Sequence, residues 1–128
     1  MNRTTLSTEE TLAIADIEQA ARDLMAEPEW AQGDRHSRAV ISTDRLRVVL
    51  TALRAGAELG SRETDDTIVV QAVRGELRIR VQGSGDTTLR AGQLAAFAQP
   101  CDWQVRAATD SLVLLTSALH QPAQPEIG

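Results

Sequence analysis

Residues 77–81 read Leu-Arg-Ile-Arg-Val, a strict alternation of apolar and charged side chains. Because successive side chains of a β-strand point to opposite faces, this pattern predicts a strand with its apolar face buried and its arginines outside. Gly75 precedes the stretch and Gly-Ser-Gly-Asp follows it at residues 83–86. Glycine and aspartate are typical turn residues, so the stretch is expected to be one strand of an antiparallel sheet.

The same period of two continues on both sides of this strand, from about Arg38 onward. It is present over residues 46–53 and 68–73, and residues 112–119 are expected to form the final strand, with turn-forming breaks at residues 55–56, 74–75, 91–92 and 109–110. Short strands separated by such turns predict an antiparallel sandwich or barrel. Residues 113–115 are apolar on both faces, which is expected of a strand in the interior of a sandwich.

The first thirty residues have a different period. Apolar side chains recur at three- and four-residue steps, which predicts an amphipathic helix over residues 8–26. These side chains are Ile14, Ile17, Ala21, Leu24 and Met25. Ser7 and Glu10 have the spacing of a capping box, and Pro28 is expected to end the helix. The polar residues 29–38 are then expected to connect the helix to the first strand.

Composition excludes several classes of protein. The chain has 128 residues, a net charge of −5 and a hydrophobic content of 42%, and all 13 of its basic residues are arginines spread along the sequence. Without a basic stripe, nucleic-acid binding is not expected. The apolar runs are too short for a membrane span, and the N-terminal region lacks the pattern of a signal peptide. A single cysteine, Cys101, forms no internal disulfide, so a cytoplasmic protein is expected.

The expected organisation is a single domain with three parts. Residues 1–37 form the helix and connector, residues 38–119 form a β-barrel, and residues 120–128 form a flexible tail.

Three glycines in the barrel region have the spacing found in one known family. Over residues 45–118 the sequence resembles a small single-domain cupin of the conserved-barrel type. The glycines are Gly56 and Gly75, which match the ends of the first cupin motif, and Gly92, which begins the second.

The cupin resemblance implies an all-β fold, an antiparallel jelly-roll barrel that is here preceded by one N-terminal amphipathic α-helix. It also implies a homodimer. Metal-dependent cupins carry two histidines and a glutamate in the first motif and a histidine in the second. Here these positions fall on Arg62, Thr64, Ile68 and Trp103, and a register slip of one residue brings in Glu63 but no histidine. Arginine, isoleucine and tryptophan offer no metal ligand, so no metal or other cofactor is expected.

The same alignment predicts a mostly apolar ligand pocket at the mouth of the barrel. Its expected lining is Arg62, Thr64, Ile68, Val70, Trp103 and Val105. A guanidinium binds planar anions in a bidentate manner, and an indole ring can stack on an apolar ligand. The prediction is therefore a metal-free protein that binds a small anionic or amphipathic molecule as a sensor or carrier, with no catalytic residue assigned.

Two alternatives remain open. A metal-independent isomerase, epimerase or lyase needs an acid and a base facing the cavity, and neither histidine falls in the barrel strands. A structural or partner-binding barrel needs no cavity, because Trp103 would fill the interior and Arg62 would pair with acidic residues of its own loop.

His36 and His120 flank the barrel, where surface positions are more common than metal ligation. Cys101 is expected to be inert, and Ser84 is expected to lie in a hairpin turn.

Overall fold

The computed structural model describes residues 4–5, 12–61, 67–97 and 101–118. The elements, in chain order, are β1 (Thr4–Thr5), α1 (Ile17–Ala26), α2 (Pro28–Gln32), β2 (Arg35–Ser42), β3 (Leu46–Leu53), β4 (Glu58–Ser61), β5 (Thr67–Arg74), β6 (Glu76–Val81), β7 (Thr87–Arg90), β8 (Leu94–Phe97), β9 (Trp103–Ala107) and β10 (Ser111–Ala118). Within these residues, no helix is long and apolar enough to cross a lipid bilayer.

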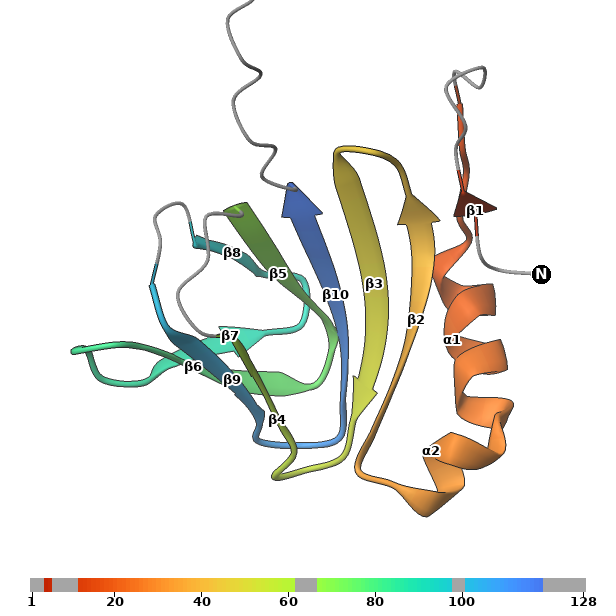
Figure 1. Cartoon of the computed structure of the whole chain (residues 1–128). Helices are drawn as coiled ribbons and strands as arrows, with labels where there is room; N and C mark the ends of the chain where they lie inside the picture. Colours follow the sequence, from red (N-terminus) through yellow and green to blue (C-terminus); the bar gives the residue numbers. More distant parts are fainter. Residues whose placement is uncertain (1–3, 6–11, 62–66, 98–100, 119–128) are drawn as a thin grey trace, which may run out of the picture.

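The strands form two sheets that face each other, and α1 and α2 lie beside the larger sheet (Figure 1). The six-stranded sheet has the order β1-β2-β3-β10-β5-β8, and the four-stranded sheet has the order β4-β9-β6-β7. Every pairing is antiparallel except that of β1 with β2. The expected antiparallel all-β architecture, preceded by a helix, is confirmed.

The main core fills the space between the two sheets. Leu77 and Ile79 of β6 face it, as their alternation predicts, and are 0% and 5% exposed. Arg78 lies on the opposite face of the same strand, where its guanidinium donates to the Glu76 carboxylate at 2.7 Å. Burial of one face of each strand is the principal stabilising contribution in such a sandwich.

A second core lies between α1 and the outer face of the six-stranded sheet. Ala20, Ala21 and Leu24 of the helix are at most 1% exposed and pack against side chains of β2, β3 and β10. The sheet-side members of this core are Val40, Leu50, Ala52 and Leu112. β10 is therefore covered on both faces, which explains why it is apolar on both faces over residues 113–115.

The predicted start of the helix is wrong. Residues 12–16 are not helical, and α1 begins at Ile17, where the Asp16 carboxylate accepts a hydrogen bond from the Gln19 backbone N–H at 3.0 Å. Asp16 thus satisfies one of the amides left free at a helix start. Ile14 is 78% exposed and takes no part in the helical apolar face. The proposed capping pair, Ser7 and Glu10, lies outside the described residues.

The segment expected to be a polar connector also contains regular structure. Pro28 begins α2, a position that suits its fixed φ and missing N–H. The Arg54 guanidinium lies 4.1 Å from the centre of the Trp30 ring and donates to the Trp30 and Gly33 carbonyl oxygens. These contacts hold α2 against the end of β3. β2 begins at Arg35.

β2 is paired along one side by β3 but only at its end by β1. The β1 pairing involves Ile41 and Ser42. The β2–β3 register shifts between Ala39 and Ile41, which marks a β-bulge at Val40. Most of β2 therefore forms an edge of the sheet within the described part of the chain.

Candidate functional site

Four of the six predicted pocket residues come together inside the barrel. Ile68 and Val70 lie on β5 of the larger sheet, and Trp103 and Val105 lie on β9 of the smaller one. All four are at most 9% exposed and belong to the same core. Arg62 and Thr64 lie outside the described residues. The guanidinium and hydroxyl that were expected to bind a ligand beside Trp103 therefore stay a prediction.

The interior near Trp103 is filled by a second aromatic side chain. The rings of Trp103 and Phe97 are stacked, with centroids 5.1 Å apart and an interplanar angle of 10°. Phe97 also lies directly across from Ile68 in the sheet. The indole Nε1 is buried and has no hydrogen-bond partner among the described residues. Within this part of the chain, the structure thus supports the view that Trp103 packs as a core residue.

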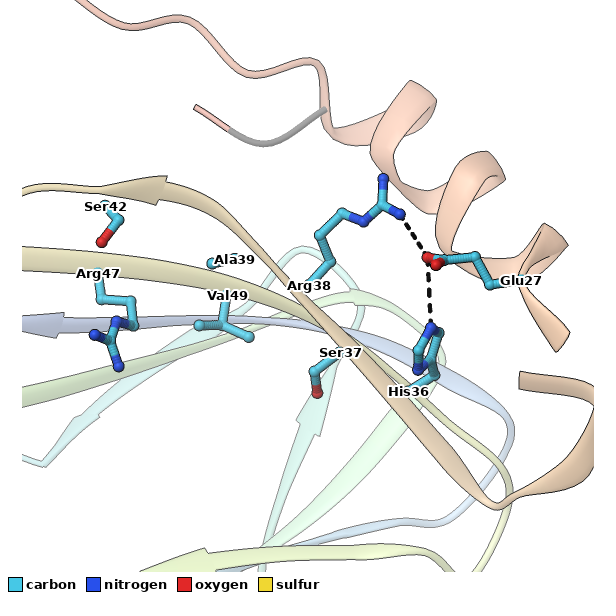
Figure 2. Close-up of a pocket in the computed structure, with 8 residues that line it drawn as sticks. All are labelled: Glu27, His36, Ser37, Arg38, Ala39, Ser42, Arg47 and Val49. Carbon is cyan, nitrogen blue, oxygen red and sulfur yellow. Dashed lines mark hydrogen bonds and ion pairs between the residues drawn. The ribbon is translucent and has the colours of Figure 1, made fainter. Parts of the chain in front are cut away.

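A groove of about 670 Å³ lies along β2 and β3, away from the Trp103–Phe97 pair. Figure 2 shows its lining: Glu27, His36, Ser37, Arg38, Ala39, Ser42, Arg47 and Val49. Leu53 belongs to the barrel core, so Val49 and Arg47, at even spacing from it on β3, lie on the barrel side of the sheet. Leu50 and Ala52 face α1 instead. The groove is therefore bordered by an uncovered part of the inner face of the sheet.

Arg47 is the cation at one end of this groove (Figure 2). It pairs across the sheet with Ser117 of β10, which in turn pairs with Ile68 of β5. Two strand spacings of about 4.8 Å place Arg47 roughly 10 Å from Ile68 in the same row. Arg47 is exposed, and its guanidinium has no ion pair or hydrogen bond with any residue that the structure describes.

The middle of the groove is lined by small apolar side chains and hydroxyl groups. Ala39 and Val49 lie opposite each other in the β2–β3 register and give it an apolar wall. The Ser37 and Thr51 hydroxyls are hydrogen-bonded to each other at 2.8 Å. Ser42 lies across from Arg47 and adds a hydroxyl at the same end. This part of the groove thus combines an apolar wall with hydroxyls and the Arg47 guanidinium.

A charged cluster borders the groove from the other face of β2, because His36 and Arg38 pair with Ala52 and Leu50 and therefore lie on the α1 side of the sheet. The Arg38 guanidinium donates to Glu27 Oε1 at 2.6 Å, and His36 Nε2 lies 3.4 Å from the same oxygen (Figure 2). Glu27 follows the last residue of α1, whereas His36 and Arg38 lie on β2. Sequence reasoning did not connect these residues, because nothing in the pattern shows that the α1–α2 corner lies against β2. His120, the other histidine, lies outside the described residues.

Ser84 and Cys101 were also considered as functional residues. The Ser84 N–H and hydroxyl both donate to the Val81 carbonyl at 2.9 Å, so the residue lies in the predicted hairpin turn. Cys101 is a partly buried free thiol that packs against the barrel core. Neither residue borders the groove.

Comparison with known proteins decides the fold. No protein-family model matches the chain, and no curated protein matches its sequence. Among solved structures, a cupin superfamily protein from Desulfitobacterium hafniense superposes with a TM-score of 0.63 at 14% identity, over 67% of this chain and 78% of that one. An RmlC-like cupin from Shewanella frigidimarina gives a TM-score of 0.61 at 22% identity, over 70% and 80% of the two chains. The chain has the cupin fold. The jelly-roll barrel expected from the glycine spacing is thereby confirmed.

The cupin fold occurs in proteins of different activity. Salicylate 1,2-dioxygenase from Pseudoaminobacter salicylatoxidans matches with a TM-score of 0.67 at 19% identity, over 79% of this chain and 31% of the enzyme. Likeness at this level of identity concerns architecture, and a shared fold does not specify chemistry. The function of this domain therefore depends on its own side chains.

Proposed function

We propose that this cupin domain binds a small anionic molecule in the groove along β2 and β3, with Arg47 holding the anionic group. One observation carries the proposal. An exposed guanidinium, unpaired within the described part of the chain, borders a groove of about 670 Å³. Arginine presents five N–H donors in a planar fork that matches a carboxylate or phosphate, and such charge-assisted contacts are stronger than neutral hydrogen bonds.

The rest of the groove suits the body of such a ligand. The Ser42 hydroxyl, across from Arg47, offers a further hydrogen bond to the anionic group. Ala39 and Val49 offer an apolar wall to an aliphatic or flat portion. Small-molecule sites in proteins usually combine an apolar lining with a few polar groups that fix orientation. The ligand class is therefore a small carboxylate or phosphate with an apolar part, bound for sensing or transport.

This proposal moves the ligand from the barrel centre to an adjoining part of its inner face. Trp103 is stacked on Phe97, which leaves its ring less suited to holding a ligand. Arg47 lies in the same row of the sheet as Ile68, so the groove continues the face on which the pocket was expected. Arg62 and Thr64 lie outside the described residues, and their role at the mouth of the barrel stays a prediction.

A second candidate is a metal-independent isomerase, epimerase or lyase acting on the same kind of molecule. The observation that favours it is that Glu27 and His36, a carboxylate and an imidazole 3.4 Å apart, border the groove. Such a pair can act as general acid and base when both reach the substrate. The two functions differ in outcome, because a binding protein returns its ligand unchanged whereas an enzyme converts it.

The test begins with native mass spectrometry of the untagged protein, which detects a co-purified molecule and also counts protomers, the homodimer being the expected state. Benzoate, citrate and inorganic phosphate are then titrated calorimetrically against the protein. Arg47→Gln is expected to weaken binding of the best probe at least tenfold, about 1.4 kcal/mol. Arg45→Gln is the matched control, because Arg45 is exposed nearby but does not line the groove.

Two results would overturn the proposal. One is a protein that carries no small molecule and binds none of the three probes. The other is binding that Arg47→Gln leaves as tight as in the original protein. Circular dichroism of each variant shows whether the fold is intact, so that a loss of binding is not a loss of structure.

A further inference from the structure

A histidine and two glutamates meet outside the barrel, where the corner between α1 and α2 lies against β2. One ligand atom from each of Glu27, Glu29 and His36 lies within 4.8 Å of the other two. We propose that these three side chains bind one divalent transition-metal ion of the zinc class. Imidazole and carboxylate together suit such an ion, and three protein ligands leave a fourth position for water.

One distance in the cluster matches a tetrahedral centre. Zinc bonds to histidine nitrogen and carboxylate oxygen are about 2.0–2.2 Å long, so two ligand atoms on one tetrahedral ion are roughly 3.4 Å apart. His36 Nε2 and Glu27 Oε1 are 3.4 Å apart. The Glu29 ligand atom lies at most 4.8 Å from the other two, which is about 1.4 Å more than the tetrahedral spacing. Glu29 is exposed, so rotation of its side chain can bring its carboxylate closer by this amount.

One of these ligand atoms is buried. His36 Nε2 is shielded from solvent, in a side chain that is 18% exposed, and makes no hydrogen bond with the described residues, although it lies 3.4 Å from Glu27 Oε1. Leaving a buried polar atom without a hydrogen bond is energetically unfavourable. In the neutral tautomer with its proton on Nδ1, Nε2 carries the lone pair that binds metal ions, and here Nε2 faces the Glu27 carboxylate. A bound ion would satisfy it.

Arg38 is expected to lower the affinity of the site for a metal ion. Two carboxylates and one guanidinium give the cluster a net charge of −1 when His36 is neutral, because Arg38 donates to Glu27 Oε1 at 2.6 Å. A fixed positive charge a few ångströms from the ion opposes metal binding. Removing it should therefore tighten binding, an effect opposite in sign to the loss of a ligand.

The experiment is calorimetric titration of zinc chloride into metal-stripped protein, repeated with cobalt(II), whose visible absorption reports tetrahedral nitrogen and oxygen ligation. We expect one ion per chain. His36→Ala and Glu27→Gln should each weaken binding at least tenfold, and Arg38→Gln should tighten it severalfold. Glu18→Gln is the matched control, because Glu18 is an exposed carboxylate of α1 that pairs with Arg74 instead. His120→Ala controls for binding by the other histidine.

Absence of stoichiometric binding would overturn the proposal, and the cluster would then be an ion pair alone. Binding that His36→Ala leaves unchanged, or that His120→Ala removes, would do the same. The result of the metal titration can be distinguished from that of the anion titration, because the two sites are far apart. Arg47 lies five residues along β3 from Ala52, the partner of His36, which is about 16 Å.

Discussion

The indole ring of Trp103 lies almost parallel to the phenyl ring of Phe97, and the pair joins the two sheets of the barrel. Trp103 belongs to β9 and Phe97 to β8, and both are less than one-tenth exposed. Trp103→Ala is expected to lower the free energy of unfolding by about 3–5 kcal/mol, because it leaves a cavity the size of a ring in the core. Urea denaturation measures the loss. Trp30 is partly exposed, so Trp30→Ala should lower the free energy of unfolding by a smaller amount. An equal decrease in the two variants would contradict the central role of the aromatic pair.

Gly75 is expected to tolerate no side chain. Its φ is +84°, and an added Cβ would lie 2.5 Å from the Asp110 carbonyl oxygen and against the Ser111 side chain. Gly75→Ala should therefore cost about 2–5 kcal/mol, from the left-handed backbone and from the steric clash together. Gly83 has a similar φ of +82° but open space around it. Gly83→Ala should cost only about 1–2 kcal/mol, and thermal melts of the two variants would show whether the clash adds to the backbone effect.

Leu24 is expected to be the residue that fixes α1 to the sheet. It is 0% exposed between the helix and the outer sheet face, whereas Leu12, also near the N-terminus, is 73% exposed. Leu24→Ala should destabilise the protein by about 2–5 kcal/mol. Leu12→Ala should change the midpoint of urea unfolding very little. If the two variants unfold alike, the second core contributes nothing to stability.

Asp16 is expected to be the N-cap of α1. Its carboxylate accepts from the Gln19 amide at 3.0 Å, and loss of such a cap costs about 1 kcal/mol. Asp16→Ala should therefore lower both the unfolding free energy and the helical circular dichroism slightly. Ser7→Ala tests the earlier start that the sequence pattern favours. A larger loss in Ser7→Ala than in Asp16→Ala would mean that the helix begins nine residues sooner.

The strands could be predicted from sequence wherever one face is apolar and the other is charged. Residues 77–81 are the clearest example, and β6 spans Glu76–Val81. β2 could not be predicted this way, because its first four residues, Arg35–Arg38, are all polar although their burial alternates. The predicted helix start is wrong because Ile14 continues the apolar spacing although its side chain is exposed.

None of the residues that line the groove belongs to the predicted pocket, for a related reason. The alternation over residues 46–53 shows that Arg47 and Leu50 lie on opposite faces, but both faces of this strand carry apolar residues. Leu50 packs against α1 and Leu53 against the barrel core. Only tertiary structure distinguishes the barrel side from the helix side. Likewise, the approach of Glu27 to His36 depends on how the α1–α2 corner folds back on β2.

The exposed edge of β2 has a consequence for the behaviour of the protein in concentrated solution. A long, straight edge strand is a template on which a second chain can add its own strand, the first step towards fibrous aggregates. Here the bulge at Val40 interrupts the row of backbone groups, and Arg35 and Arg38 would oppose like charges on an approaching copy. Deleting Val40 would straighten the strand, and the protein would then tend to polymerise edge to edge.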